Sequence, residues 1–259
     1  MHHFQYKNDE LYCENVSVSH IAHSVGTPFY LYSNNTLVHH FKVFDSAFSP
    51  LRHLVCFSAK ANSNIAILKT LINQGSGVDI VSGGELFRAL AAGVEPKKIV
   101  YSGVGKKRNE IDYALQADIL MFNIESSQEL RVIDSVAGEL GKKARIAFRI
   151  NPDIDPQTHP YISTGLKKNK FGIDIEKSLD EYRYARELKN IEIIGVDCHI
   201  GSQITDVEPF VDALKRTKEL MYQLKKEGIT IQYLDLGGGL GITYDDETPP
   251  HPNAYAQAI

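Results

Sequence analysis

Lys60 is the first residue whose surroundings suggest chemistry. It lies between Ala59 and Ala61, directly after the short apolar run 54–57. Small neighbours leave space around a lysine ammonium, and partial desolvation there would lower its pKa towards nucleophilic amine chemistry. A lysine that extends its amine into solvent is the simpler alternative, and Lys60 alone does not decide between the two.

Two further candidates follow the apolar run 191–198. His199 could lay its flat ring against a planar ligand, or it could be a structural hydrogen-bonding group. Ser202 follows a glycine and could offer both its hydroxyl group and its backbone N–H to an oxyanion. The end of this run is therefore a second candidate ligand site.

Three consecutive glycines, Gly237, Gly238 and Gly239, follow the apolar run 231–236. Glycines directly after a buried strand let backbone N–H groups approach a ligand closely, and such a loop is a common phosphate site. A tight, flexible turn is the alternative. A dinucleotide-binding fingerprint matches poorly, because the glycines come late in the chain and have the wrong spacing.

Charged residues interrupt two of the apolar runs. Asp79 lies within 78–81, and Arg149 lies within 145–150. A buried arginine needs either a structural carboxylate or a bound anion as its partner, and the sequence leaves both open. Residues 82–85 (Ser-Gly-Gly-Glu), which follow the first of these runs, could simply be a helix start with its capping box.

The elements that must position these residues alternate along the chain. Seven apolar runs lie between residues 54 and 236, separated by segments such as 126–140 whose apolar residues recur every three or four positions. This alternation predicts an α/β fold with a parallel sheet and right-handed crossovers. The spacing, roughly one unit per 30 residues, favours a (β/α)8 TIM-type barrel over a doubly wound open sheet. The eighth strand of that barrel would be due only at about residue 264, so we expect a barrel lacking its last strand.

The first 50 residues do not follow this alternation. Residues 27–32 are predicted to form a strand, and residues 34–44 are predicted to form a helix. A strand that stands apart from the barrel indicates a second domain. We therefore expect residues 1–35 to belong to a separate β domain and residues 36–259 to form the barrel.

Composition excludes several classes of protein. The chain has 259 residues, of which 43% are hydrophobic and 23% charged, with a net charge of −4, as in ordinary globular proteins. The balanced charge predicts no nucleic-acid partner, and the lysine cluster 167–170 is too short to supply one. Three cysteines far apart, with no CxxC pair, predict no metal site and favour a reducing cytoplasm. The sequence shows neither a signal peptide nor the ~18 apolar residues of a membrane span.

Taken together, the lysine, the histidine and the glycine loop suit a planar phosphorylated aldehyde such as pyridoxal 5'-phosphate. Residues 57–62, 199–203 and 237–239 resemble those of the alanine-racemase-fold (group IV) pyridoxal-phosphate decarboxylases. Residues 159–166 with 170–173 resemble the diaminopimelate decarboxylases in particular, as do residues 101–106 and 79–86. Ornithine decarboxylases share the lysine and glycine motifs but lack the 159–173 segment in this form.

The resemblance implies a role for each candidate. Lys60 matches the lysine that is joined to the cofactor aldehyde, and His199 matches the histidine stacked on the ring face opposite the substrate. Ser202 matches a phosphate contact, as does the run Gly237, Gly238 and Gly239, in which Gly239 is the strongest match. Arg149 and Asp79 match polar residues on the cofactor side of the barrel. The implied reaction converts meso-2,6-diaminopimelate to L-lysine and CO2, the last step of lysine biosynthesis, in a cytoplasmic homodimer with shared active sites.

Members of this family continue beyond the barrel into a β-sandwich domain, to which residues 1–35 would belong. That later part carries a Glu-Pro-Gly-Arg motif and a Cys-Glu-Ser segment, and neither occurs after Gly241 here. The resemblance therefore predicts an N-terminal portion that is inactive and poorly stable by itself, because strands one and seven would be open edges. Three alternatives stay open: a racemase or another basic amino-acid decarboxylase, a non-catalytic pyridoxal-phosphate carrier, and a phosphate-binding barrel without pyridoxal.

Overall fold

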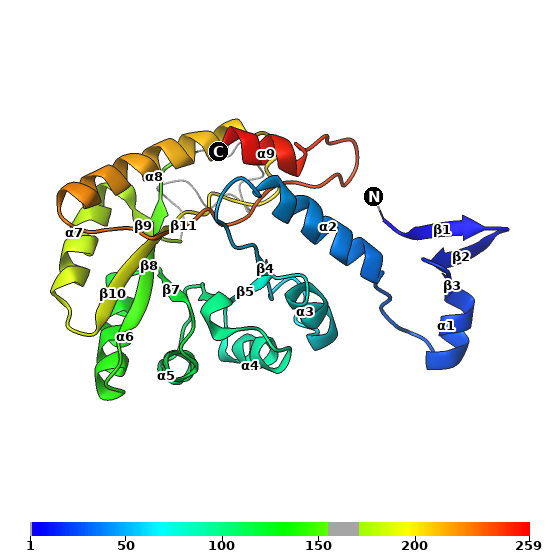
Figure 1. Ribbon diagram of the computed structural model, residues 1–259, viewed down its shortest axis with the longest axis horizontal. Coiled ribbons are helices and arrows are strands. Elements are labelled where there is room, and N and C mark those ends of the chain that lie inside the picture. Colours follow the sequence, from blue (N-terminus) through cyan, green and yellow to red (C-terminus); the bar gives the residue numbers. More distant parts are fainter. Residues whose placement is uncertain (1, 155–170) are drawn as a thin grey trace.

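A curled parallel sheet forms the centre of the molecule (Figure 1). The computed structural model describes residues 2–154 and 171–259. The sheet order is β11-β10-β8-β7-β6-β5-β4, and β9 pairs with β8 outside this path. The strands are β4 (Cys56–Ser58), β5 (Gly77–Ile80), β6 (Ile99–Tyr101), β7 (Met121–Ile124), β8 (Ala144–Asn151), β9 (Ile173–Asp174), β10 (Ile191–Asp197) and β11 (Tyr233–Asp235).

The strand order distinguishes the two predicted architectures. A doubly wound sheet reverses its direction at a switch point, whereas a barrel adds each new strand on the same side. Here the seven strands of the main path follow one another in chain order from β4 to β11, without a reversal. The predicted α/β barrel is therefore confirmed, and its described strands form an open path in which β4 and β11 are the two ends.

Helices follow the strands and cover the outside of the sheet (Figure 1). The helical segments predicted from apolar spacing are confirmed to within a few residues. In α6, for example, Leu130, Ile133 and Ala137 are buried at helical spacing. The crossover helices are α3 (Ile65–Ile72), α4 (Gly83–Ala91), α5 (Arg108–Ala117), α6 (Ser127–Glu139), α7 (Ile175–Glu187) and α8 (Glu208–Lys226), with the 3-10 helix η1 (Pro96–Lys98) before β6.

Capping boxes fix the points where strands turn into helices. The Ser82 hydroxyl accepts a hydrogen bond from the Glu85 amide, and the Glu85 carboxylate accepts one from the Val81 amide at 2.7 Å. The predicted capping box of residues 82–85 is present in a variant form, because the Glu85 carboxylate accepts the amide of the residue before the N-cap Ser82. Ser126 and Glu129 form the same arrangement at the start of α6. Such caps satisfy amides that the first helical turn leaves unpaired.

The N-terminal region contains a small antiparallel sheet that the sequence analysis did not predict. Strands β1 (Phe4–Lys7), β2 (Glu10–Cys13) and β3 (Val16–Ser17) form a meander, followed by α1 (Val18–Val25). Asn8 and Asp9 join β1 to β2, both with positive φ. That is the requirement of a two-residue type I′ turn, so the Asn-Asp pair was the signal that could have revealed the hairpin.

The predicted strand over residues 27–32 is wrong for the described structure. These residues join α1 to α2 (Asn34–Ala47) without entering a sheet, and the Tyr30 side chain is 90% exposed. A β-branched or aromatic segment becomes a strand only where a neighbouring strand pairs with its backbone, and none does so within the described residues. The predicted helix over 34–44 is confirmed, and α2 continues three residues further.

The last described helix, α9 (Pro252–Ala258), packs against α2 (Figure 1). Its Tyr255 is buried, and its ring meets that of Phe210 edge-on at 4.8 Å between centroids. Phe44 and Phe48 of the α2 region contact the same ring.

The motif segment 159–166 and Lys170 lie outside the described residues. Among the described helices, none is both long and apolar enough to cross a bilayer.

Candidate functional site

Polar side chains gather at the carboxyl ends of the parallel strands. Strand register aligns Ser58 with Asp79, and it aligns Asp197 with both Arg149 and Asp235. Residues in register on parallel strands project to the same face of the sheet. Each strand of the main path thus places a polar residue at or next to its end: Ser58, Asp79, Ser102, Asn123, Arg149, Asp197 and Asp235.

Asp79 is held by two hydroxyl groups. Ser58 donates to its carboxylate at 2.7 Å and Ser102 donates at 2.6 Å. Burial raises the pKa of Asp79 above its ordinary value, while the two hydrogen bonds and the charge of Lys60 act in the opposite direction. Asp79 is therefore a fixed, partly desolvated acid within electrostatic range of Lys60.

Lys60 follows β4 in a turn. The amide of the preceding Ala59 donates to the Asp79 backbone oxygen at 2.8 Å, which fixes this turn against β5, and Ala59 is completely buried. The lysine side chain itself is exposed. The desolvation expected from its two alanine neighbours is therefore absent, because Ala61 and Lys60 itself are both exposed and only Ala59 is buried.

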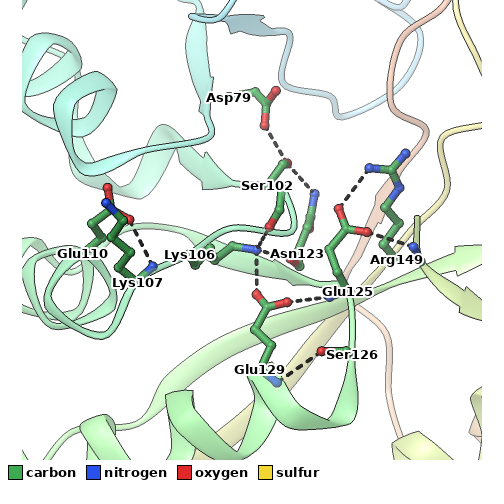
Figure 2. A network of polar contacts seen from close by, with 12 residues as sticks. Asp79, Ser102, Lys106, Lys107, Glu110, Asn123, Glu125, Ser126, Glu129 and Arg149 are labelled. Carbon is green, nitrogen blue, oxygen red and sulfur yellow. Dashed lines mark hydrogen bonds and ion pairs between the residues drawn. The ribbon is translucent and has the colours of Figure 1, made fainter. Parts of the chain in front are cut away.

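Arg149 has a structural carboxylate as its partner. Its guanidinium donates to Glu125 at 3.0 Å, and the second oxygen of Glu125 accepts a hydrogen bond from the Gly172 amide at 2.8 Å (Figure 2). The guanidinium also lies 5.0 Å from the centre of the Phe171 ring. Glu125 is the structural carboxylate that the sequence offered as one of two possible partners. Glu125 thus neutralises the buried arginine and anchors the chain at residues 171–172.

His199 lies against the first two glycines of the glycine loop, which we define as Gly237, Gly238 and Gly239. The Gly238 amide donates to Nδ1 of His199 at 3.2 Å. Burial lowers the pKa of His199 to about 4, and the positive charges of Arg149 and Lys60 act in the same direction. The imidazole is therefore neutral at pH 7, and because its Nδ1 accepts, it carries its proton on Nε2.

The glycine loop needs glycine at its first and third positions. Gly237 has φ +64°, and a Cβ there would lie 2.7 Å from the His199 Cβ. Gly239 has φ +111°, and a Cβ there would lie 2.2 Å from the carbonyl oxygen of Gly201. A Cβ at Gly238 would instead meet open space. The loop is therefore packed closely on one side and open on the other.

The open side of the loop offers hydrogen-bond donors. Within the described part of the chain, the Gly239 amide donates to no other group, although its carbonyl accepts from Ile204 at 2.8 Å. Ser202 lies in the neighbouring turn and is exposed. These are features that a phosphate site requires, since the amide of Gly239 and a nearby exposed hydroxyl group suit a phosphate oxygen. The residues present fit pyridoxal phosphate, with Lys60 as the exposed amine and His199 as a flat neutral ring.

Several polar residues of this site, besides Ser58 and Ser102, were not predicted from the sequence. Asn123, Glu125, Asp197 and Asp235 all lie at or next to the ends of strands. Burial raises the pKa of Asp197 well above its ordinary value, and the charge of Asp235 adds to this effect. Single polar residues at the ends of apolar runs were the available signal, but a periodicity analysis treats each run as uniformly apolar.

The fold and the polar side chains at the carboxyl ends of its strands define a class, a β/α barrel built to bind a pyridoxal group. Residues 34–259 match the family described as "Pyridoxal-dependent decarboxylase, pyridoxal binding domain", and the chain belongs to this family. The match confirms the predicted cofactor at the level of the family.

Diaminopimelate decarboxylases from several bacteria are among the similar proteins. The chain is 54% identical over 259 residues to that of Haemophilus influenzae and 52% identical over 260 residues to that of Vibrio cholerae, covering 62% of each relative. It also matches the crystal structure of diaminopimelate decarboxylase from Helicobacter pylori complexed with L-lysine, with a TM-score of 0.90, 43% identity and coverage of 93% of this chain and 61% of that one. The predicted family resemblance is confirmed, and the chain spans about three fifths of these relatives.

Proposed function

We propose that the full protein decarboxylates meso-2,6-diaminopimelate to L-lysine and CO2, the last step of lysine biosynthesis. The observation that carries this proposal is a contrast in similarity. Identity to diaminopimelate decarboxylases is 54% and 52% for the relatives given above, whereas a lysine/ornithine decarboxylase structure from Vibrio vulnificus matches at 20% identity. That lower similarity shows a common fold alone, so substrate choice is inferred from the higher identities.

The chain's own residues have separate tasks in this proposal. Lys60 supplies the exposed amine that holds the cofactor aldehyde. His199 supplies a flat ring that stays uncharged above a pKa of about 4. Gly239 and Ser202 donate to the phosphate, and the glycine loop excludes side-chain atoms from that place. Pyridoxal phosphate, when bound, supplies the electron sink for the bond electrons that remain after CO2 leaves.

Asp79 and Arg149 lie on the same face of the sheet, and each has its own side-chain partners. Two hydroxyl groups hold the Asp79 carboxylate, and Glu125 neutralises Arg149. In this proposal they fix the polar environment on the cofactor side of the barrel. Asp79 also lies within electrostatic range of Lys60, whose charge favours the ionised form of the Asp79 carboxyl group.

The division into residues 1–35 and 36–259 belongs to the same proposal. Its support is that the family match begins at residue 34 and that a separate antiparallel meander precedes it. The family resemblance supports a homodimer with shared active sites. The three free cysteines support a reducing compartment, which is the cytoplasm in this proposal. Light scattering on the full protein tests the dimer, and a monomer at catalytic concentrations would contradict it.

The experiment is an assay of the full protein on a panel of amino acids. We expect CO2 and lysine from meso-diaminopimelate, and neither CO2 from ornithine nor racemisation of alanine. Turnover of ornithine without turnover of diaminopimelate would overturn the proposed substrate.

The lysine assignment has its own readout. The visible absorbance that a lysine–pyridoxal linkage produces should be present in the wild type and lost in Lys60→Ala. Lys69→Ala, at an exposed lysine on α3, is the matched control and should keep the band. An unchanged spectrum in Lys60→Ala would show that another residue holds the cofactor.

A further inference from the structure

A chain of hydrogen bonds crosses the interior of the barrel and ends at the glycine loop. The Asn123 side chain at the end of β7 donates to Asp235 at 3.0 Å, although the two residues are 112 positions apart in the sequence. The other oxygen of Asp235 accepts a hydrogen bond from the Gly237 amide at 2.9 Å. Asp235 therefore links the interior of the barrel to the first residue of the loop.

The donor end of this chain is itself fixed. Lys106, completely buried, donates to the backbone oxygen of Asn123 at 2.7 Å and to Glu129 at 2.6 Å (Figure 2). Asn123 is 1% exposed, and its side-chain nitrogen donates to both Ser102 and Asp235. The contact with Asp235 is sufficient to fix the orientation of the amide group, because the opposite orientation would present an oxygen to that carboxylate.

The conformation of the glycine loop depends on the position in which Asp235 holds Gly237. Gly237 has a left-handed backbone and lies against His199, and the next amide, that of Gly238, donates to the same ring. Within the described residues, the Asp235 carboxylate is the acceptor for the Gly237 amide. A shift of that carboxylate would therefore move the first residue of the loop and rotate the amides that follow it.

We propose that Asn123 is a positioning residue, which holds the phosphate-binding conformation of the glycine loop through Asp235. The inference rests on the proposed function, in which the loop binds the cofactor phosphate. A purely structural role is the competing explanation, because Asn123 also contacts Ser102, which in turn donates to Asp79. The two roles separate experimentally: only the arm through Asp235 leads to the glycine loop.

The test compares pyridoxal phosphate with pyridoxal as ligands of the cofactor-free full protein. Both carry the same aldehyde and ring, so the ratio of their dissociation constants reports recognition of the phosphate alone. We expect Asn123→Leu to weaken binding of pyridoxal phosphate about tenfold while binding of pyridoxal stays nearly constant, as for loss of a hydrogen bond to a charged group. Ser102→Ala, in the other arm of the network, is the matched control and should leave the ratio unchanged.

A second variant covers the case in which Asn123→Leu does not fold. Asp235→Asn keeps the shape but leaves one acceptor oxygen for two donors, so one of the two contacts must break. Like Asn123→Leu, it should reduce the preference of the protein for pyridoxal phosphate over pyridoxal. The double variant Asn123→Leu/Asp235→Asn should lose no more than the worse single variant, because both act along one path.

The possible failures have different signatures. If the wild type does not prefer pyridoxal phosphate over pyridoxal, the proposed phosphate site itself is wrong. If the wild type has that preference and Asn123→Leu and Asp235→Asn both keep it, only the positioning role is overturned. A parallel loss of affinity for both ligands in these variants would likewise assign Asn123 to barrel structure alone.

Discussion

At the scale of single residues, His199 combines a basic group with surroundings that disfavour its charge. Its pKa is about 4 in the folded chain, against an ordinary value of about 6.5 in the unfolded chain. Between these values the unfolded chain binds a proton and the folded chain does not. Stability contributed by the neutral ring is therefore present above pH 6.5 and lost as the pH falls towards 4.

This linkage predicts that His199→Gln flattens the pH dependence of stability. The drop in unfolding free energy between pH 7 and pH 4.5 should be smaller by about 2 kcal/mol than in the wild type. Urea denaturation of the cofactor-free full protein measures it. His39→Gln, at an exposed histidine of α2, is the control and should keep the wild-type slope. Equal slopes in all three proteins would contradict the buried, neutral histidine.

Neighbouring glycines of the glycine loop should respond differently to the same change. Gly239→Ala places a methyl group against the Gly201 carbonyl at a positive φ and should destabilise the protein by about 2 kcal/mol or more. Gly238→Ala adds its methyl group in open space and should leave the unfolding free energy within about 0.5 kcal/mol. Thermal unfolding in the absence of cofactor compares the two, and a loss equal to that of Gly239→Ala in the Gly238 variant would refute the loop geometry.

At the scale of elements, three successive strand-to-helix turns use a glutamate to tie down backbone amides. Glu85, Glu110 and Glu129 each accept an amide of the turn before their own helix, and Glu110 also accepts the Gly83 amide at the start of the neighbouring α4. Glu129 additionally pairs with the buried Lys106. Burial raises the pKa of Glu129, and the lysine opposes that effect. The turn after β7 thus depends on a buried ion pair.

Lys106→Met should expose that dependence. It leaves a buried carboxylate without its partner, which costs about 3 kcal/mol at pH 8. Protonation of Glu129 relieves the cost, and because its folded pKa lies above its unfolded value, the loss should shrink as the pH falls from 8 to 5. Chemical denaturation at both pH values measures this, with the exposed Lys107→Met as control. A loss that is independent of pH would show that the ion pair does not carry the effect.

Elements were easier to predict from the sequence than the contacts between them. Apolar spacing located α6 and the strands because each signal is contained in one stretch of chain. The hairpin β1–β2 was missed because each strand has only four residues and β1 is mostly exposed. Asp235 was missed as a site residue for another reason: its partner Asn123, 112 positions away, becomes a neighbour only after the barrel has curled, and no spacing rule encodes that.

At the scale of the whole molecule, α2 and α9 connect the two ends of the strand path. Helix α2 precedes β4 and α9 follows β11, and they meet through aromatic side chains around Tyr255. The open path from β4 to β11 is thus bridged on the outside by helices. The cluster also includes Phe210 of α8, so three elements share one buried ring.

Tyr255→Ala should therefore destabilise far more than its place in a seven-residue helix suggests. Removal of a buried aromatic side chain costs about 3–5 kcal/mol, and here it also separates α9 from α2. Tyr244→Ala, at a tyrosine that is 77% exposed, is the control and should change stability by no more than about 0.5 kcal/mol. Urea denaturation measures both, and similar small losses would show that α9 does not stabilise the barrel.

The bond between Asn123 and Asp235 also has a consequence for the order of folding. Contacts between residues far apart in sequence form late, because the intervening chain must first lose its entropy. This bond closes 112 residues, including β8, β10 and their helices. The glycine loop should consequently acquire its shape only after β11 has joined the sheet. In a refolding experiment, recovery of phosphate recognition would then lag behind helix formation and mark the arrival of the last described strand.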